Sequence, residues 1–283
     1  MLQVAVEIFS SRLYKRLTIG AKGDKMDTVL NILRRIFMKK TKKFLAGLLT
    51  GLSVLAGSLC LVACNGDNSS SSSNSGNSQP KGVVYEIIDD TAQVVDYDGT
   101  ATSVTIEATY EGVAVTKIAD EAFKNTSIVS VEIPNSVLSI GDSAFYLCDD
   151  LTSVTIPNSV TAIGASAFRG CTGLTSVTIS GSVTSIGNRA FEDCSGLTTL
   201  EIPGGVASIG NSAFTNCTSL TSVTIASSVT SIGDGAFAYS TALASVNFGG
   251  TKSQWNAITG NTNWTFVTAT KVVCSNGEVD LKK

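Results

Sequence analysis

The chain has 283 residues, a formal net charge of −3, a hydrophobic share of 43% and no histidine. This hydrophobic share is ordinary for globular proteins and excludes bulk disorder. The absence of histidine excludes Ser-His-Asp and Cys-His hydrolases, an imidazole general base and histidine-ligated zinc or haem. Residues 1–64 hold 11 Lys/Arg against 3 Asp/Glu, a balance of +8, whereas residues 65–283 hold 9 against 20, a balance of −11. Because so acidic a body repels a phosphate backbone, no nucleic-acid partner is expected.

The N-terminal region has the pattern of an export signal. Four lysines between positions 39 and 43 precede an apolar run over residues 44–63, which ends at Cys64. The run is long enough to span a bilayer, but its glycines, serines and threonine favour a cleavable signal over a retained anchor. Its end, Leu61-Val62-Ala63-Cys64, resembles the lipobox of bacterial lipoproteins. That resemblance implies that residues 38–63 are a lipoprotein signal peptide and that Cys64 is the lipidated residue.

The segments on either side of this signal have different interpretations. Met38 begins a conventional signal, so residues 1–37 are interpreted as an over-extended start, with a cytoplasmic extension as the alternative. Residues 64–80 combine the lipidated cysteine with a stretch of Ser, Asn and Gly that contains no core-forming residue. This composition predicts a flexible tether between the membrane and a folded body.

The body is an internal repeat of 23 residues. The dipeptide Ala-Phe recurs at steps of 22 and then 23, ending at Phe123, Phe145, Phe168, Phe191, Phe214 and Phe237. Within one unit, Val154-Thr155-Ile156 alternates as a strand does. The spacing of Ala167, Phe168, Cys171 and Leu174 predicts one face of a short helical turn. Neither piece could bury its apolar side alone, so the sequence predicts a β-rich solenoid of stacked coils, each with one strand and a short helical turn.

The repeat motifs resemble a known family. Leu-x-x-Val-x-Ile-Pro, Ser-Val-x-x-Ile-Gly and Ala-Phe-x-x-Cys recur in fixed order over residues 103–250. This order closely resembles leucine-rich repeats of the BspA type, which occur in bacterial surface proteins. We expect residues 81–102 to form an N-terminal cap, with a hairpin at Asp89-Asp90, and residues 251–283 to form a C-terminal cap, because an open solenoid needs covered ends.

Four cysteines share one position of the repeat: Cys148, Cys171, Cys194 and Cys217. They could fill the core as small apolar residues, form disulfides or hold a metal, and the sequence leaves their thiol state open. The core interpretation is favoured because all four lie on the face predicted to point inward. No metal or cofactor site is predicted, and the acidic residues near Asp89 lack the spacing of a calcium loop.

The outward positions of the predicted strands form a candidate binding face. Small hydroxyl residues and two carboxylates make it up: Ser130, Glu132, Ser153, Thr155, Ser176, Thr178, Thr199, Glu201, Ser222, Thr224, Ser245 and Asn247. The alternative is that Ser and Thr merely suit a solvated strand. Other candidate contacts are the loop residues Tyr146, Arg169, Glu192 and Tyr239.

No catalytic constellation is present in the sequence, so an enzyme is not expected. The resemblance implies a non-enzymatic adhesion module, displayed at the cell surface, whose partner is a protein or glycan outside the cell. The lipobox implies that the membrane is a second partner, through the lipid anchor. A structural spacer of the envelope without a specific ligand is the alternative.

Overall fold

The computed structural model describes residues 82–260 and 262–281, and the structural statements below concern these residues. They lie within a compact unit that spans residues 74–283; a separate unit spans residues 1–73. Residues 1–37, the predicted signal peptide and the whole tether of residues 64–80, with Cys64, lie outside the described residues. In the described part of the chain, no helix is long and apolar enough to cross a membrane.

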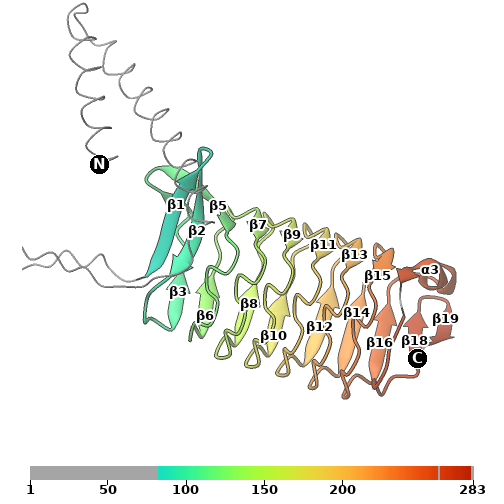
Figure 1. Ribbon diagram of the computed structural model, residues 1–283. Coiled ribbons are helices and arrows are strands. Elements are labelled where there is room, and N and C mark those ends of the chain that lie inside the picture. Colours follow the sequence, from blue (N-terminus) through green and yellow to red (C-terminus); the bar gives the residue numbers. More distant parts are fainter. Residues whose placement is uncertain (1–81, 261, 282–283) are drawn as a thin grey trace, which may run out of the picture. The chain divides into compact units, whose positions relative to one another are not determined.

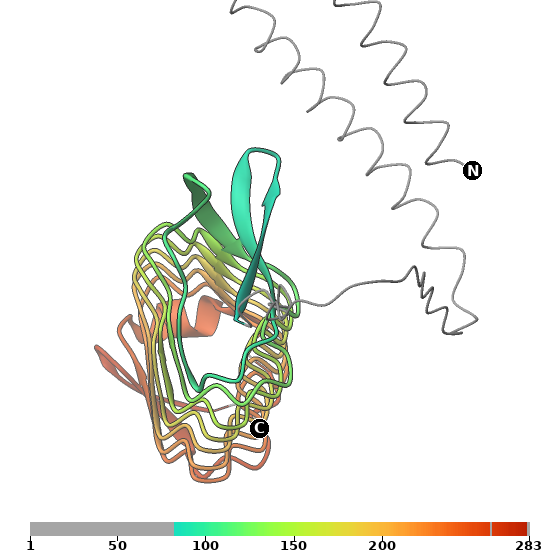
Figure 2. The same ribbon diagram turned by 90° about the vertical axis from the view of Figure 1, so that its left-hand side faces the viewer.

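The described residues form a solenoid with one strand ladder along each of two sides of the coils (Figures 1 and 2). The first ladder is a sheet with the order β1 (Val83–Ile88), β2 (Thr91–Tyr97), β5 (Val113–Ile118), β7 (Ser139–Ile140), β9 (Ala162–Ile163), β11 (Ser185–Ile186), β13 (Ser208–Ile209), β15 (Ser231–Ile232) and β17 (Thr259–Gly260), and β4 (Thr109–Tyr110) pairs with β5. The second ladder consists of two sheets, namely β3 (Ser103–Thr105), β6 (Ser130–Glu132), β8 (Ser153–Thr155) and β10 (Ser176–Thr178), then β12 (Thr199–Ile202), β14 (Ser222–Ile225), β16 (Ser245–Phe248), β18 (Lys271–Cys274) and β19 (Gly277–Asp280).

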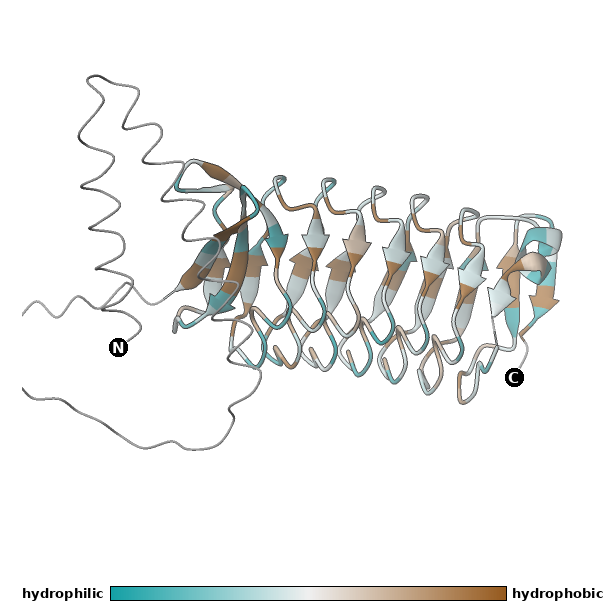
Figure 3. Cartoon of the chain, turned by 45° about the horizontal axis from the view of Figure 1, so that its top comes forward, coloured by the Kyte–Doolittle hydropathy of each residue, from teal (hydrophilic) through white to brown (hydrophobic). Residues whose placement is uncertain are grey.

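Strand pairing confirms the predicted 23-residue coil. Val154 lies opposite Val177 in the second ladder, and Ile163 lies opposite Ile186 in the first. Equivalent residues of successive coils therefore stack on one another, and apolar residues recur at the same place along the solenoid (Figure 3). Each coil contains two short strands rather than the single strand expected, because the Ser/Ala-Ile dipeptides also pair from coil to coil.

A column of stacked aromatic rings runs through the core. Adjacent rings lie 4.9–5.5 Å apart, in the order Tyr97, Phe123, Phe145, Phe168, Phe191, Phe214, Phe237 and Trp264. Neighbouring Phe rings are within 8° of parallel, and each Phe side chain is fully buried. The predicted inward position of the Phe row is confirmed.

The segment expected to form a short helical turn is not helical. Ser166 and Gly170 have φ of 55° and 76°, so two left-handed residues interrupt any helix there. The Phe168 N–H instead donates to the Ala190 carbonyl of the next coil at 2.7 Å. So short a helix would leave most of its backbone groups without partners, whereas the neighbouring coil offers a carbonyl to every second N–H. Consecutive tight turns thus bury apolar residues that lie three and four positions apart, as a helix would.

Hairpins occur near both ends of the array. The strands β1 and β2 pair antiparallel about the predicted turn at Asp89-Asp90, both residues having left-handed φ. The strands β18 and β19 pair antiparallel about Ser275-Asn276, and helix α3 (Lys252–Ala257) lies before them. The action of residues 81–102 and 251–283 as caps stays a prediction.

The four repeat cysteines are free and fully buried, which confirms the core interpretation. Each thiol donates a hydrogen bond to a Phe carbonyl of the preceding coil; for example, the Cys171 Sγ lies 3.1 Å from the Phe145 carbonyl oxygen. The corresponding distances for Cys148, Cys194 and Cys217 are 3.0, 3.1 and 3.3 Å. The thiols therefore stabilise contacts between coils while filling the core.

Candidate binding face

The predicted binding face lies on the second strand ladder. All twelve of its residues occupy outward positions of β6, β8, β10, β12, β14 and β16, and each is exposed or half-buried. The residues between them, such as Val154 and Val223, point into the core. This alternation follows from the period of two along a strand, which the sequence already shows.

Strand register brings the outward residues into rows. Ser153 lies opposite Ser176, and Thr155 opposite Thr178. The rows are not continuous, because β6 and β8 pair at Ser130 and Ser153 alone and β10 does not pair with β12. The face therefore has an N-terminal part on β6, β8 and β10 and a C-terminal part on β12, β14 and β16.

Most polar groups on the face are not used to hold the fold together. The side chains of Thr155, Thr178 and Thr224 make no hydrogen bond to any described residue. In contrast, the hydroxyls of Thr152 and Thr175, which precede the same strands, donate to backbone carbonyls of the preceding coil at 3.2 and 3.1 Å. The threonines that precede the strands therefore hold successive coils together, whereas Thr155, Thr178 and Thr224 on the face form no such contact.

A few contacts do occur within the face. The Ser130 hydroxyl lies 3.0 Å from that of Ser103, and the Thr105 hydroxyl donates to a Glu132 carboxylate oxygen at 3.4 Å. At the other end, the Asn247 amide donates to the Ser245 hydroxyl at 3.1 Å. These contacts position side chains without removing them from solvent.

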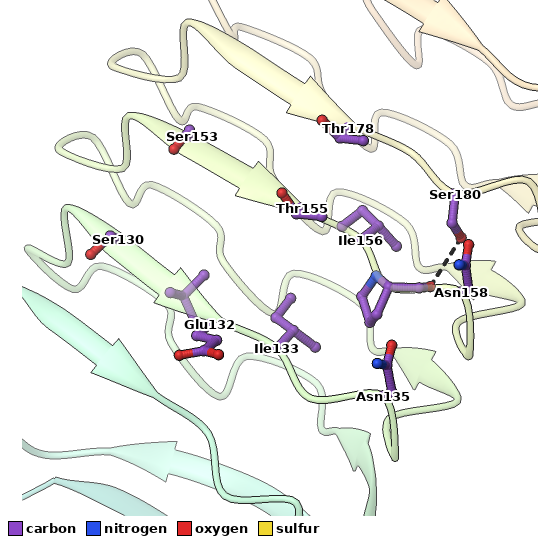
Figure 4. Close-up of a pocket in the computed structure, with 12 residues that line it drawn as sticks. Ser130, Glu132, Ile133, Asn135, Ser153, Thr155, Ile156, Asn158, Thr178 and Ser180 are labelled. Atoms are coloured by element: carbon purple, nitrogen blue, oxygen red, sulfur yellow. Dashed lines mark hydrogen bonds between the residues drawn. The ribbon is translucent and has the colours of Figure 1, made fainter.

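The N-terminal part of the face contains an open hollow of about 550 Å³ (Figure 4). Its lining comes from three successive coils and comprises Ser130, Val131, Glu132, Ile133, Asn135, Ser153, Thr155, Ile156, Pro157, Asn158, Thr178 and Ser180. The Ser180 hydroxyl donates to the Pro157 carbonyl at 2.9 Å, which fixes one wall. The hollow lies where β6 and β8 cease to pair.

Sequence reasoning predicts five of the twelve lining residues, and the polar residues that it misses are Asn135, Asn158 and Ser180. A signal for the two asparagines exists, because Pro-Asn occurs in two successive units only, at Pro134-Asn135 and Pro157-Asn158. That signal could not locate a hollow, since the separation of β6 and β8 depends on strand pairing that the repeat pattern does not encode.

The alternative loop residues are largely engaged with one another. The Arg169 guanidinium lies 5.8 Å from the centre of the Tyr146 ring and forms an ion pair with Glu192 at 2.8 Å. Tyr239 lies apart from this group, with its ring stacked on that of Phe266 at 5.0 Å. Three of the four loop candidates therefore form one cluster along a turn edge.

Comparison with known proteins identifies the repeat. Residues 116–244 match the family model described as a BspA type leucine-rich repeat region, in six copies. The solved leucine-rich repeat protein of T. pallidum is 29% identical with a TM-score of 0.56, over 59% of this chain and 78% of that chain. A leucine-rich cell surface protein from Faecalibacterium prausnitzii A2-165 is also 29% identical, over 69% of this chain and 56% of that chain, with a TM-score of 0.47. The search of curated proteins found no match.

Residues 116–244 are thus a BspA-type leucine-rich repeat region. This match agrees with the fold described above, and the BspA-type repeat family points to a protein-interaction role.

Proposed function

We propose that the chain is a lipid-anchored, surface-displayed adhesion module that binds a protein or glycan outside the cell without catalysing a reaction. The binding surface is the candidate binding face on the second ladder. Family membership supports the interaction role, and the lipobox-like end at Cys64, followed by a Ser/Asn/Gly tether, supports display at the membrane.

The observation that carries this proposal is the set of free threonine hydroxyls on both parts of the candidate binding face. The side chains of Thr155, Thr178 and Thr224 are exposed and make no hydrogen bond to a described residue. Each offers one small polar contact, which alone would not offset the entropy lost on association. Several such contacts on one rigid face can act together, because the first contact holds the others in place.

The charge of the face supports selection among partners. Glu132 and Glu201 are both exposed, and the twelve residues of the face include no lysine or arginine. Acidic partners are therefore disfavoured by like-charge repulsion, which acts on association rate and specificity more than on affinity.

The test replaces Thr155, Thr178 and Thr224 together with lysine in the full chain. These positions point to solvent, so the fold should persist, while the added bulk and charge should reduce binding of a partner captured from the extracellular medium at least tenfold. The matched control replaces Thr172, Thr218 and Thr241, exposed turn residues outside the ladder, with lysine. This control adds the same charge and should leave binding within twofold of the parent.

Equal binding by the triple lysine variant and the parent would contradict the proposed face, and the turn edge around Tyr146 and Arg169 would become the candidate binding surface. If neither the parent nor any variant retains a partner, the structural spacer becomes the better account.

Lipid anchoring is tested separately. Cys64→Ala should abolish lipid attachment as measured by mass spectrometry, and an intact N-terminus in the parent chain would contradict lipidation at Cys64.

A further inference from the structure

We propose that the hollow between β6, β8 and β10 receives a lysine or arginine side chain from an extended segment of a partner protein. This inference rests on the proposed function, and it names the chemistry of the partner at one part of the same face.

The charge of the hollow is not balanced within the protein. Glu132 is the one ionisable residue in its lining, and its carboxylate forms no ion pair with a described residue. Its carboxylate accepts a 3.4 Å hydrogen bond from the Thr105 hydroxyl, which leaves most of its acceptor capacity unused. The ladder does continue to a cation at Lys271 on β18, but that ammonium is paired with Glu278 at 2.8 Å.

The remaining polar groups of the lining suit a cationic donor. Hydroxyls from Ser130, Ser153, Thr155 and Thr178 and the amides of Asn135 and Asn158 surround the opening (Figure 4). Their oxygens can accept hydrogen bonds from those N–H donors of an ammonium or guanidinium group that do not point at the carboxylate. A carboxylate with several neutral acceptors is therefore complementary to one positively charged side chain.

The walls of the hollow suit the rest of such a side chain. Half-buried Pro157 contributes apolar surface to the lining, which also includes Ile133 and Ile156, 8% and 1% exposed. Lysine and arginine combine an alkyl stem, which packs on apolar surface, with a charged end that needs polar partners. The hollow presents both kinds of surface within about 550 Å³.

The composition of the lining favours a protein segment over a neutral sugar. No aromatic ring lines the hollow, so a sugar ring would have no flat apolar surface on which to stack. A neutral ligand would also leave the Glu132 carboxylate without a charge partner. The hollow lies where the pairing of β6 with β8, at Ser130 and Ser153, does not continue, and its lining from three successive coils can be contacted by an extended segment.

The experiment measures binding of a fluorescently labelled hexalysine peptide to the full chain by fluorescence anisotropy at low ionic strength. Hexaglutamine is the neutral control peptide and should bind at least tenfold more weakly. Glu132→Gln should weaken hexalysine binding at least fivefold, because it removes the charge and keeps the shape. The matched variant Glu201→Gln removes the other carboxylate of the face, outside the hollow, and should change binding less than twofold.

Equal losses in Glu132→Gln and Glu201→Gln would show that hexalysine senses the overall negative charge, and this would overturn the proposal. Equal binding of hexalysine and hexaglutamine would also overturn it, as would a neutral oligosaccharide that binds in a Glu132-dependent way while hexalysine does not bind.

The two proposals can fail separately. If the captured partner depends on Thr155, Thr178 and Thr224 but hexalysine does not bind, the proposed face stands and the inference about the hollow is wrong. If hexalysine binding depends on Glu132 while the triple threonine variant keeps its captured partner, the inference about the hollow is supported and the proposed binding role of the three threonines is wrong.

Discussion

At the scale of single residues, the repeat position that holds Cys148, Cys171, Cys194 and Cys217 accepts other small side chains that donate a hydrogen bond. In the last repeat unit Ser240 occupies this position, and its hydroxyl donates to the Phe214 carbonyl at 2.9 Å, the same contact that the thiols make. In the first unit the Thr126 hydroxyl donates to the Phe123 carbonyl at 2.8 Å. The position therefore requires a small side chain with a hydrogen-bond donor, and thiol chemistry is not what it uses.

Burial of these thiols predicts a dependence of stability on pH. Desolvation raises the pKa of the Cys194 and Cys217 thiols well above the ordinary value of 9.0. Above about pH 9 the unfolded chain therefore loses thiol protons that the folded chain keeps. The contribution of these two thiols to the free energy of unfolding is complete below pH 9. It falls as the pH rises, by about 1–2 kcal/mol per thiol between pH 9 and 10.5.

The measurement compares urea midpoints at pH 8 and 10.5 for the parent and for Cys194→Ser with Cys217→Ser. The double variant keeps the donors, as Ser240 does, and should lose less stability than the parent over this range. Identical losses in the two chains would show that other groups cause the pH dependence.

At the scale of elements, strands and turns differ in how well the sequence predicts them. The alternation at Val154-Thr155-Ile156 predicts β8 and the exposure of Thr155 correctly, because side-chain direction follows directly from strand period. The helical spacing of Phe168 and Cys171 predicts a helical turn after Gly164, and this prediction is wrong. Spacing reports which side chains are buried but does not report where backbone N–H groups find acceptors, and in this fold they find them in the next coil.

Close packing of successive turns predicts different roles for two glycines. A Cβ on Gly187 would lie 2.6 Å from the Gly164 carbonyl carbon, whereas a Cβ on Gly181 would meet no atom within 4 Å. Gly187→Ala should therefore destabilise the fold by about 1–3 kcal/mol through overpacking. Gly181→Ala should be neutral or stabilise it by up to about 1 kcal/mol, because alanine restricts the unfolded chain.

Thermal or urea unfolding of the two alanine variants tests this difference with the same chemical change. Similar midpoints for Gly187→Ala and Gly181→Ala would mean that the coils can separate enough to admit a methyl group, contrary to the close approach seen here.

At the scale of the whole solenoid, stability is shared between neighbouring coils. Each coil contacts the coils before and after it, so the free energy of unfolding is approximately a sum of coil terms and nearest-neighbour terms. The Phe191 ring lies 5.1 Å from Phe168 and 5.2 Å from Phe214, and it is fully buried. It therefore takes part in two interfaces at once.

Loss of this ring should weaken the array at its middle. Phe191→Ala should cost about 3–5 kcal/mol, as truncation of a buried phenylalanine does. Phe266, whose side chain is 66% exposed, is the matched control, and Phe266→Ala should cost less than about 1 kcal/mol. Urea unfolding measures both values.

Hydrogen exchange measures how far along the solenoid backbone amides lose protection in Phe191→Ala. Because the inter-coil bonds join the Phe168 N–H to the coil of Phe191, and the Phe191 N–H to the coil of Phe214, amides of both neighbouring coils should lose protection in Phe191→Ala. The coils near β2 and β18 should lose less, since they share no interface with residue 191. Uniform loss of protection along the solenoid would instead indicate that the array unfolds as a single cooperative unit, and an unchanged urea midpoint would contradict the role of the aromatic column in stability.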